Sequence, residues 1–154
     1  LNLMPTAISS VKINLSSENE TEELAVKISK KLNLGNIVFL YGEIGVGKTT
    51  FVKYLIQEFQ KTHKLKRTEV TSPTFNLLNE YIIGKIKINH YDLFRLKSNE
   101  EVKNLDLFSD TQNSITLIEW PQIIIEKPKD LIEFVFEYEE NYKKRFVHIK
   151  GLDL

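Results

Sequence analysis

A glycine-rich octapeptide is the segment of this sequence with the clearest capacity for chemistry. Residues 42–49, Gly-Glu-Ile-Gly-Val-Gly-Lys-Thr, match the P-loop pattern G-x-x-x-x-G-K-[ST]. Glycines let successive backbone N–H groups turn inward around a phosphate, and a helix starting there adds its positive dipole end. Lys48 supplies a cation for the β- and γ-phosphates, and the Thr49 hydroxyl can bind Mg²⁺. The segment predicts a nucleoside triphosphate site rather than a dinucleotide site, because Thr50 stands where G-x-G-x-x-G needs its third glycine.

A P-loop enzyme also needs an acidic group near Mg²⁺, usually at the end of a buried strand beside the P-loop strand. Glu119 ends the apolar run 115–118 and fits this description best. Asp92, in the string H-Y-D-L-F-R, is the second candidate and lies on or just past a strand. For either acid, a plain strand end or turn cap is the alternative. Trp120, the only tryptophan, directly follows Glu119, although a single tryptophan is more often part of a core.

Two other polar segments have both a functional and a purely structural interpretation. Thr71-Ser-Pro-Thr74 could be a nucleotide-sensing switch loop, although Ser-Pro more commonly marks a simple turn. Residues 61–67 hold four basic side chains and His63, which favours a solvated helix end over a phosphate site. The histidines have no neighbouring cysteine and no H-x-x-x-H spacing, so the sequence gives no support to a zinc site.

The elements around the glycine-rich segment are those that a P-loop requires. Residues 37–41, Ile-Val-Phe-Leu-Tyr, form a continuous apolar run that is typical of a strand buried on both faces of a parallel sheet. Phe51, Leu55 and Phe59 recur at helical spacing, which predicts an amphipathic helix over 49–60. The order is therefore buried strand, glycine-rich loop, helix.

The rest of the chain alternates between strand and helix patterns. Ser17 and Glu20 have the spacing of a capping box, so we expect a helix that begins there and ends at Gly35. Ser98 and Glu101 repeat this spacing for a short helix. Strands are predicted at 11–15, 75–83, 85–94, 115–118, 131–138 and 145–149, with the second and third, and the last two, as antiparallel pairs. These elements predict an α/β fold: one three-layer α/β/α P-loop domain over 1–154, with a mixed, mainly parallel central sheet and antiparallel additions.

Composition narrows the class of protein. A length of 154 residues with 42% hydrophobic residues suits one domain with one core. Lys and Arg number 21, as do Asp and Glu, so the chain lacks the basic excess by which proteins bind nucleic acid alone. The absence of cysteine excludes disulfides and thiolate metal sites and fits a reducing compartment. No run approaches the roughly 18 apolar residues of a membrane span, and residues 1–10 lack a leader pattern, so we expect a cytoplasmic protein without a membrane contact.

Four strings, taken in order, resemble the bacterial TsaE (YjeE) family. They are the P-loop at 42–49, S-P-T-F at 72–75, H-Y-D-L-F-R-L at 90–96 and E-W-P-Q at 119–122. The similarity runs from about residue 16 to residue 149. P-loops alone are common, but the other three strings together are specific to this family. One departure is segment 103–107, which has no glycine where many relatives carry one.

The resemblance implies which residues bind ATP and Mg²⁺. The phosphates would be held by Gly42, Glu43, Gly45, Val46, Gly47, Lys48, Thr49 and Thr50, and Mg²⁺ by Thr49 and Glu119. Asp92 would be the essential acidic residue near the γ-phosphate and, with Lys48, would carry the catalytic role. Trp120, Thr21 and Arg145 would lie beside the nucleotide, and 72–75 would be the switch loop.

The same resemblance implies a function in making N6-threonylcarbamoyladenosine at position 37 of tRNA. The chain would be the ATP-hydrolysing subunit, slow alone, acting with the TsaB–TsaD heterodimer that performs the transfer and holds the tRNA. A small-molecule kinase is one rival, but such enzymes usually close several arginines over the phosphoryl groups, and this chain has three arginines without an evident lid. A GTPase-type switch is the other, but Lys-Pro-Lys-Asp at 127–130 lacks the [NT]-K pair of a guanine reader.

Overall fold

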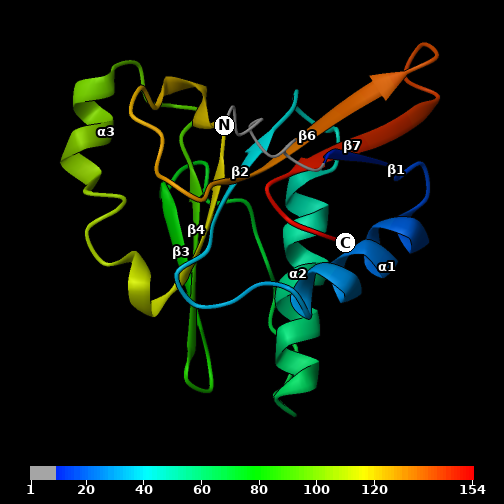
Figure 1. The fold of residues 1–154 in the computed structure, drawn as a ribbon, viewed down its shortest axis with the longest axis horizontal. Coiled ribbons are helices and arrows are strands. Elements are labelled where there is room, and N and C mark those ends of the chain that lie inside the picture. Colours follow the sequence, from blue (N-terminus) through cyan, green and yellow to red (C-terminus); the bar gives the residue numbers. More distant parts are fainter. Residues whose placement is uncertain (1–9) are drawn as a thin grey trace, which may run out of the picture.

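The computed structural model describes residues 10–154, and a seven-stranded sheet forms its centre (Figure 1). The strands are β1 (Ser10–Asn14), β2 (Ile37–Tyr41), β3 (Leu78–Ile83), β4 (Ile86–Asp92), β5 (Ile115–Glu119), β6 (Ile132–Glu139) and β7 (Lys144–Lys150). Their order is β1-β7-β6-β2-β5-β4-β3. The central pairs β6–β2, β2–β5 and β5–β4 are parallel, and β3, β7 and β1 add antiparallel pairs at the two sides. The predictions made for residues 1–9, namely the lack of a leader and the start of the domain, lie outside the described residues.

Helices cover both faces of this sheet. The helices α1 (Glu18–Ser29) and α2 (Lys48–Thr62) lie together on one face, and α3 (Asn99–Leu105) lies on the other (Figure 1). Two 3-10 segments, η1 (Thr111–Asn113) and η2 (Pro121–Ile123), flank β5. Phe51 and Phe134 belong to the larger core, on the α1 and α2 side, and Phe39 and Val102 to the smaller core, on the α3 side. The predicted three-layer fold with a mixed sheet is therefore confirmed.

Local signals account for most of the element boundaries. The capping box at α1 is present: the Ser17 side chain accepts from the Glu20 N–H, and the Glu20 carboxylate accepts from the Ser17 N–H. Ser98 caps α3 by accepting from the Glu101 N–H at 3.2 Å. The buried strand β2 and both predicted antiparallel hairpins form as the patterns indicate. Within residues 10–154 the longest helix has 15 residues, and no helix is long and apolar enough to cross a membrane.

The end of α1 differs from the prediction. The helix ends at Ser29 rather than near Gly35. Beyond it, the Asn36 side chain accepts a hydrogen bond from the Asn33 N–H at 2.7 Å, so this segment forms a turn of its own. Asparagine side chains compete with helical hydrogen bonding in this way, which is why the apolar stripe alone overestimated the helix.

Two strands also differ in detail. Residues 75–77 do not extend β3, because Leu77 has a φ of +66° and its N–H donates to the Pro73 carbonyl at 2.6 Å. This turn moves the start of β3 to Leu78. The first strand lies at the edge of the sheet and is mostly exposed, and only Ile13 is half-buried. Its alternation of apolar and polar residues therefore reflects an edge strand rather than a half-buried one.

Candidate nucleotide-binding site

The carboxyl ends of three parallel strands meet at one edge of the sheet, beside the start of α2. Leu40 of β2 and Asp92 of β4 are both register partners of Glu119, the last residue of β5. Ligands of open α/β sheets bind at this edge. A cavity of about 270 Å³, here called the P-loop cavity, opens there. It is lined by Ile44, Gly45, Gly47, Lys48, Thr49, Thr50, Ser72, Thr74, Asp92, Phe94, Glu119 and Trp120.

The loop between β2 and α2 depends on its glycines. Gly42, Gly45 and Gly47 have φ angles of +148°, +79° and +116°. A Cβ atom at Gly42 would lie 2.8 Å from Cγ1 of Val46 and 2.9 Å from the carbonyl oxygen of Phe136, so the backbone passes very close there. Gly47 is the N-cap of α2 and has no side chain, which leaves the N–H groups of the first helical turn open for an anion.

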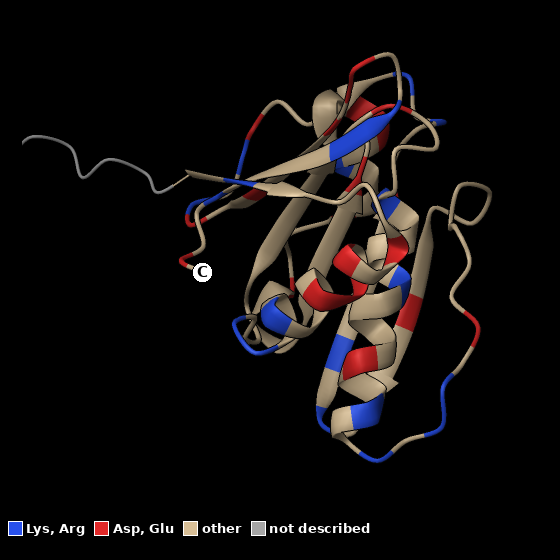
Figure 2. Cartoon of the chain, turned by 90° about the vertical axis from the view of Figure 1, so that its right-hand side faces the viewer, with Lys and Arg blue, Asp and Glu red and all other residues tan. Residues whose placement is uncertain are grey.

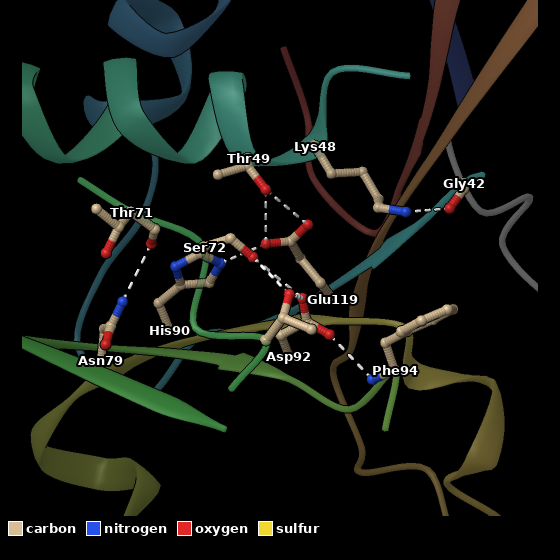
Figure 3. Close-up of polar contacts among 11 residues, drawn as sticks. Gly42, Lys48, Thr49, Thr71, Ser72, Asn79, His90, Asp92, Phe94 and Glu119 are labelled. Atoms are coloured by element: carbon tan, nitrogen blue, oxygen red, sulfur yellow. Dashed lines mark hydrogen bonds and ion pairs between the residues drawn. The ribbon is translucent and has the colours of Figure 1, made fainter. Parts of the chain in front are cut away.

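Lys48 is buried at the floor of this loop. Its Nζ donates to the carbonyl oxygen of Gly42 (Figure 3). It also donates to the carbonyl oxygen of Glu43, at 3.4 Å. The same atom lies 3.9 Å from the centre of the Trp120 ring. Burial lowers the pKa of the Lys48 ammonium, and nearby carboxylates oppose this shift. An anion bound beside Lys48 would therefore meet a poorly solvated cation, which strengthens the attraction.

Glu119 joins α2 to β4 through a short polar chain. The Thr49 Oγ1 lies 3.2 Å from each carboxylate oxygen of Glu119, and His90 Nε2 lies 2.6 Å from Oε2 (Figure 3). Neighbouring oxygen ligands of an octahedral Mg²⁺, at bond lengths of about 2.1 Å, are about 3 Å apart, so this hydroxyl and carboxylate are spaced as adjacent ligands. Within residues 10–154 no three His, Cys, Asp or Glu side chains form a metal cluster, so Mg²⁺ here would take its other ligands from phosphate and water.

Asp92 is held through both of its carboxylate oxygens. Its Oδ1 accepts from the Phe94 N–H at 2.9 Å, and its Oδ2 accepts from the Thr74 hydroxyl at 2.7 Å and the Ser72 hydroxyl at 3.4 Å (Figure 3). Asp92 as a residue is 3% exposed, and it lines the P-loop cavity. The segment 72–75, predicted to be a switch loop, is thus hydrogen-bonded directly to Asp92.

A second cavity, of about 160 Å³, adjoins the first and is here called the side cavity. It is lined by Leu15, Ser16, Ser17, Glu18, Thr21, Val46, Gly47, Thr50 and Arg145. Gly47 and Thr50 line both cavities. The Arg145 guanidinium lies 5.5 Å from the centre of the Tyr138 ring, and the Tyr138 hydroxyl donates to the Gly45 carbonyl at 2.7 Å. The start of α1 and the C-terminal hairpin therefore both reach the P-loop.

The structure brings most of the predicted binding residues to these two cavities. Gly42 and Glu43 line neither: Gly42 participates through its carbonyl, and the Glu43 side chain is exposed. Sequence reasoning did not single out His90 or Tyr138 as site residues. For His90 a signal existed, because the His-x-Asp spacing places both side chains on one face of a strand. The hydrogen bond from Tyr138 to Gly45 joins residues 93 positions apart, so no pattern in the neighbouring sequence predicts it.

The basic segment 61–67 lies away from these cavities. It begins near the C-terminal end of α2, about 20 Å from the P-loop end of that helix at 1.5 Å per residue. Figure 2 shows basic residues at this end of α2 and along the loop that follows. All seven residues are exposed. Their place supports the interpretation as a solvated helix end, where the helix dipole favours cations.

The strand, glycine-rich loop and helix, set at the carboxyl edge of a mixed sheet, define an α/β protein of the P-loop class. The family model for "Threonylcarbamoyl adenosine biosynthesis protein TsaE" matches residues 15–147. The chain therefore belongs to the TsaE family, as its motifs indicated.

Similar proteins agree with this assignment. The tRNA threonylcarbamoyladenosine biosynthesis protein TsaE of Rickettsia conorii is 42% identical over 110 residues, which are 71% of this chain and 61% of that protein. The protein of the same name from Aquifex aeolicus is 36% identical over 140 residues, 90% of this chain and 96% of its own. A crystal structure of YdiB from Bacillus subtilis has the same fold, with a TM-score of 0.71 at 22% identity over 97% of this chain and 90% of that one. The chain thus spans about three fifths of the Rickettsia conorii relative and nearly all of the Aquifex aeolicus one.

Proposed function

We propose that this chain binds ATP with Mg²⁺ and hydrolyses it, as the ATPase subunit for N6-threonylcarbamoyladenosine modification at position 37 of tRNA. The observation that carries the proposal is the P-loop cavity, where Lys48, Thr49, Glu119 and Asp92 line one space. Membership of the TsaE family supports the pathway, because the relatives are named for the biosynthesis of this nucleoside.

The two cavities suggest how the nucleotide would lie. The triphosphate would follow residues 42–50, with the open N–H groups of α2 and the Lys48 ammonium facing the β- and γ-phosphates. The ribose and base would take the side cavity, because it adjoins the P-loop cavity through Thr50 and is lined by Thr21 and Arg145. Trp120 would flank the phosphates, since its ring lies against Lys48.

Mg²⁺ would be held by the Thr49 hydroxyl and the Glu119 carboxylate, whose spacing fits adjacent ligands. When bound, the ion would neutralise part of the charge on the phosphates. The role of Thr49 and Glu119 would be to fix the position of the ion relative to the Lys48 ammonium.

Asp92 is the residue that we assign to the attacking water. Three hydrogen bonds hold its carboxylate at the cavity wall, so it can orient a water molecule or accept a proton from it. The water oxygen bonds to the γ-phosphorus as the bond to the β–γ bridging oxygen breaks, which gives ADP and phosphate. Lys48 stabilises the negative charge on the transferred group.

The partner that we propose is the TsaB–TsaD heterodimer, with tRNA reached through it in the cytoplasm. The support is the family resemblance together with the net charge of zero, which gives this chain little means of binding tRNA alone.

The rival functions find no support in the described residues. None of the three arginines, Arg67, Arg95 and Arg145, lines the P-loop cavity, whereas a kinase usually closes several over its phosphates. Lys127, the lysine of the weak guanine-reader resemblance, pairs with Glu133 at 3.2 Å. The family match over residues 15–147 is to TsaE.

ATP turnover with and without TsaB–TsaD tests this proposal. We expect slow hydrolysis by the chain alone and faster hydrolysis with the heterodimer. Lys48→Ala should abolish both activities, and Lys61→Ala, an exposed lysine of the same helix, should change neither. Absence of stimulation would contradict the pathway assignment. Phosphorylation of a nucleoside or sugar at about 1–100 per second would instead establish a kinase.

A further inference from the structure

His90 and Glu119 form a buried pair beneath the P-loop cavity. Both side chains are almost completely enclosed, with 0% and 2% of their surface exposed. The contact of 2.6 Å joins His90 Nε2 to Oε2 of Glu119, and the same carboxylate accepts from the Thr49 hydroxyl at 3.2 Å. An ionised carboxylate only accepts hydrogen bonds, so with Glu119 ionised we assign Nε2 of His90 as the donor.

The backbone fixes His90 in this place. In the parallel pairing of β4 with β5, Asp92 is the register partner of Glu119, and His90 lies two residues earlier on the same face. Two acidic side chains therefore end neighbouring strands side by side. Asp92 is held by the hydroxyls of Thr74 and Ser72, whereas Glu119 is held by Thr49 and His90.

The other ring nitrogen indicates that His90 is not there for packing alone. Nδ1 of His90 is buried and has no hydrogen-bond partner among the described residues. Burying a polar atom without a partner costs free energy, so an apolar residue would fill this core position at lower cost. The single hydrogen bond that the ring does make is the one to Glu119.

We propose that His90 is a positioning residue that holds the Glu119 carboxylate toward Thr49 in the orientation that binds Mg²⁺. This inference rests on the proposed function, since it assigns a purpose to His90 only if Glu119 is a Mg²⁺ ligand. A glutamate has three side-chain torsions, and a hydrogen bond on Oε2 together with the contacts to Thr49 restricts them. Partners that orient a metal ligand typically change metal affinity by about 10–100-fold when they are removed.

Two amide variants test this role with little change in size or polarity. His90→Gln places an amide nitrogen near the position of Nε2 and can still donate to Glu119, whereas His90→Asn is too short and ends near the position of Nδ1. The matched control is Ile88→Val, because Ile88 is a buried residue of the same strand and face that belongs to the core rather than to the site. ATP affinity is measured by Trp120 fluorescence in Mg²⁺ and in EDTA, with thermal unfolding recorded for each variant.

The quantity of interest is the factor by which Mg²⁺ strengthens ATP binding. We expect His90→Asn to reduce this factor by about tenfold or more and to leave ATP affinity in EDTA within about threefold of the wild type. His90→Gln should retain most of the factor, and Ile88→Val all of it.

Equal factors for the Asn and Gln variants, or an unchanged factor in His90→Asn, would overturn the inference while leaving the proposed function intact. A weakening by His90→Asn that is the same in Mg²⁺ and EDTA would show a general structural role and would also overturn it. If the wild type bound no ATP in either condition, the proposed function would fail, and this inference with it.

Discussion

Gly42 is the residue whose replacement should distort the P-loop most. In Gly42→Ala the new Cβ would lie 2.8 Å from Val46 Cγ1 and 2.9 Å from the carbonyl oxygen of Phe136, at a φ of +148°. Holding an alanine at this positive φ destabilises the fold by about 1–3 kcal/mol. Forcing its methyl group into a packed position costs about 1–3 kcal/mol more. The Phe136 carbonyl belongs to a strand and cannot move aside, so relief must come from the P-loop itself.

Gly35→Ala is the matched control for this prediction. Gly35 also has a positive φ, +96°, but a Cβ there would have no atom within 4 Å. It therefore carries the backbone cost without the overlap. The steric overlap should make Gly42→Ala less stable than Gly35→Ala by about 2 kcal/mol in free energy of unfolding. This difference should place its thermal midpoint about 4–8 °C below that of Gly35→Ala, measured by circular dichroism. Only Gly42→Ala should also weaken the Trp120 response to ATP, because the Gly42 carbonyl is a hydrogen-bond acceptor of Lys48. Equal midpoints and equal ATP responses for the two variants would refute this account of the loop.

Three other changes probe the site and the surface. Asp92→Ala should keep ATP binding by Trp120 fluorescence and lower turnover by about 10²-fold or more, and a loss of binding instead would contradict the assigned role. Lys48→Met should abolish ATP binding while its thermal midpoint at neutral pH stays at or above that of the wild type, because burial lowers the Lys48 pKa and a charged lysine there opposes folding. This advantage should shrink as pH rises through the lowered pKa, where the folded-state lysine becomes neutral. Lys12→Gln should raise the Glu139 pKa, measured by NMR titration, because the hydrogen bond from Lys12 lowers it. The stability from this pair is present above the ordinary carboxyl pKa of 4.5 and is lost as pH falls through the lowered one. High salt, near 1 M, should also remove most of this stability, because it screens exposed charges.

Much of the fold follows from signals that lie within one element. The apolar run 37–41 and the helical spacing after it predicted β2 and α2, since a strand buried on both faces and an amphipathic helix each have their own periodicity. The capping residues Ser17 and Ser98 marked the start of α1 and α3, because a side chain bonded to the first turn is a local event.

Two boundaries were missed because local turns are not visible in apolar spacing. The segment after α1 turns at the Asn33–Asn36 hydrogen bond, and β3 starts after the turn that Leu77 closes on Pro73. Other contacts could not be predicted because they join distant segments. In the site, P-loop spacing and strand-end position were enough to select Lys48 and Glu119 as candidates. The hydrogen bonds from His90 to Glu119 and from Tyr138 to the P-loop appear only once β4, β5 and β6 are assembled into one sheet.

The most direct test of the central claim is the amount of N6-threonylcarbamoyladenosine formed per TsaD in a reaction that contains tRNA, a threonylcarbamoyl donor, ATP and TsaB–TsaD. With this chain present, we expect many modified tRNA molecules per TsaD. With the Lys48→Ala variant in its place, the yield should fall to that of the reaction without the chain. An equal yield with the wild type, with the variant and without the chain would contradict the claim that ATP hydrolysis at this P-loop serves the modification of tRNA.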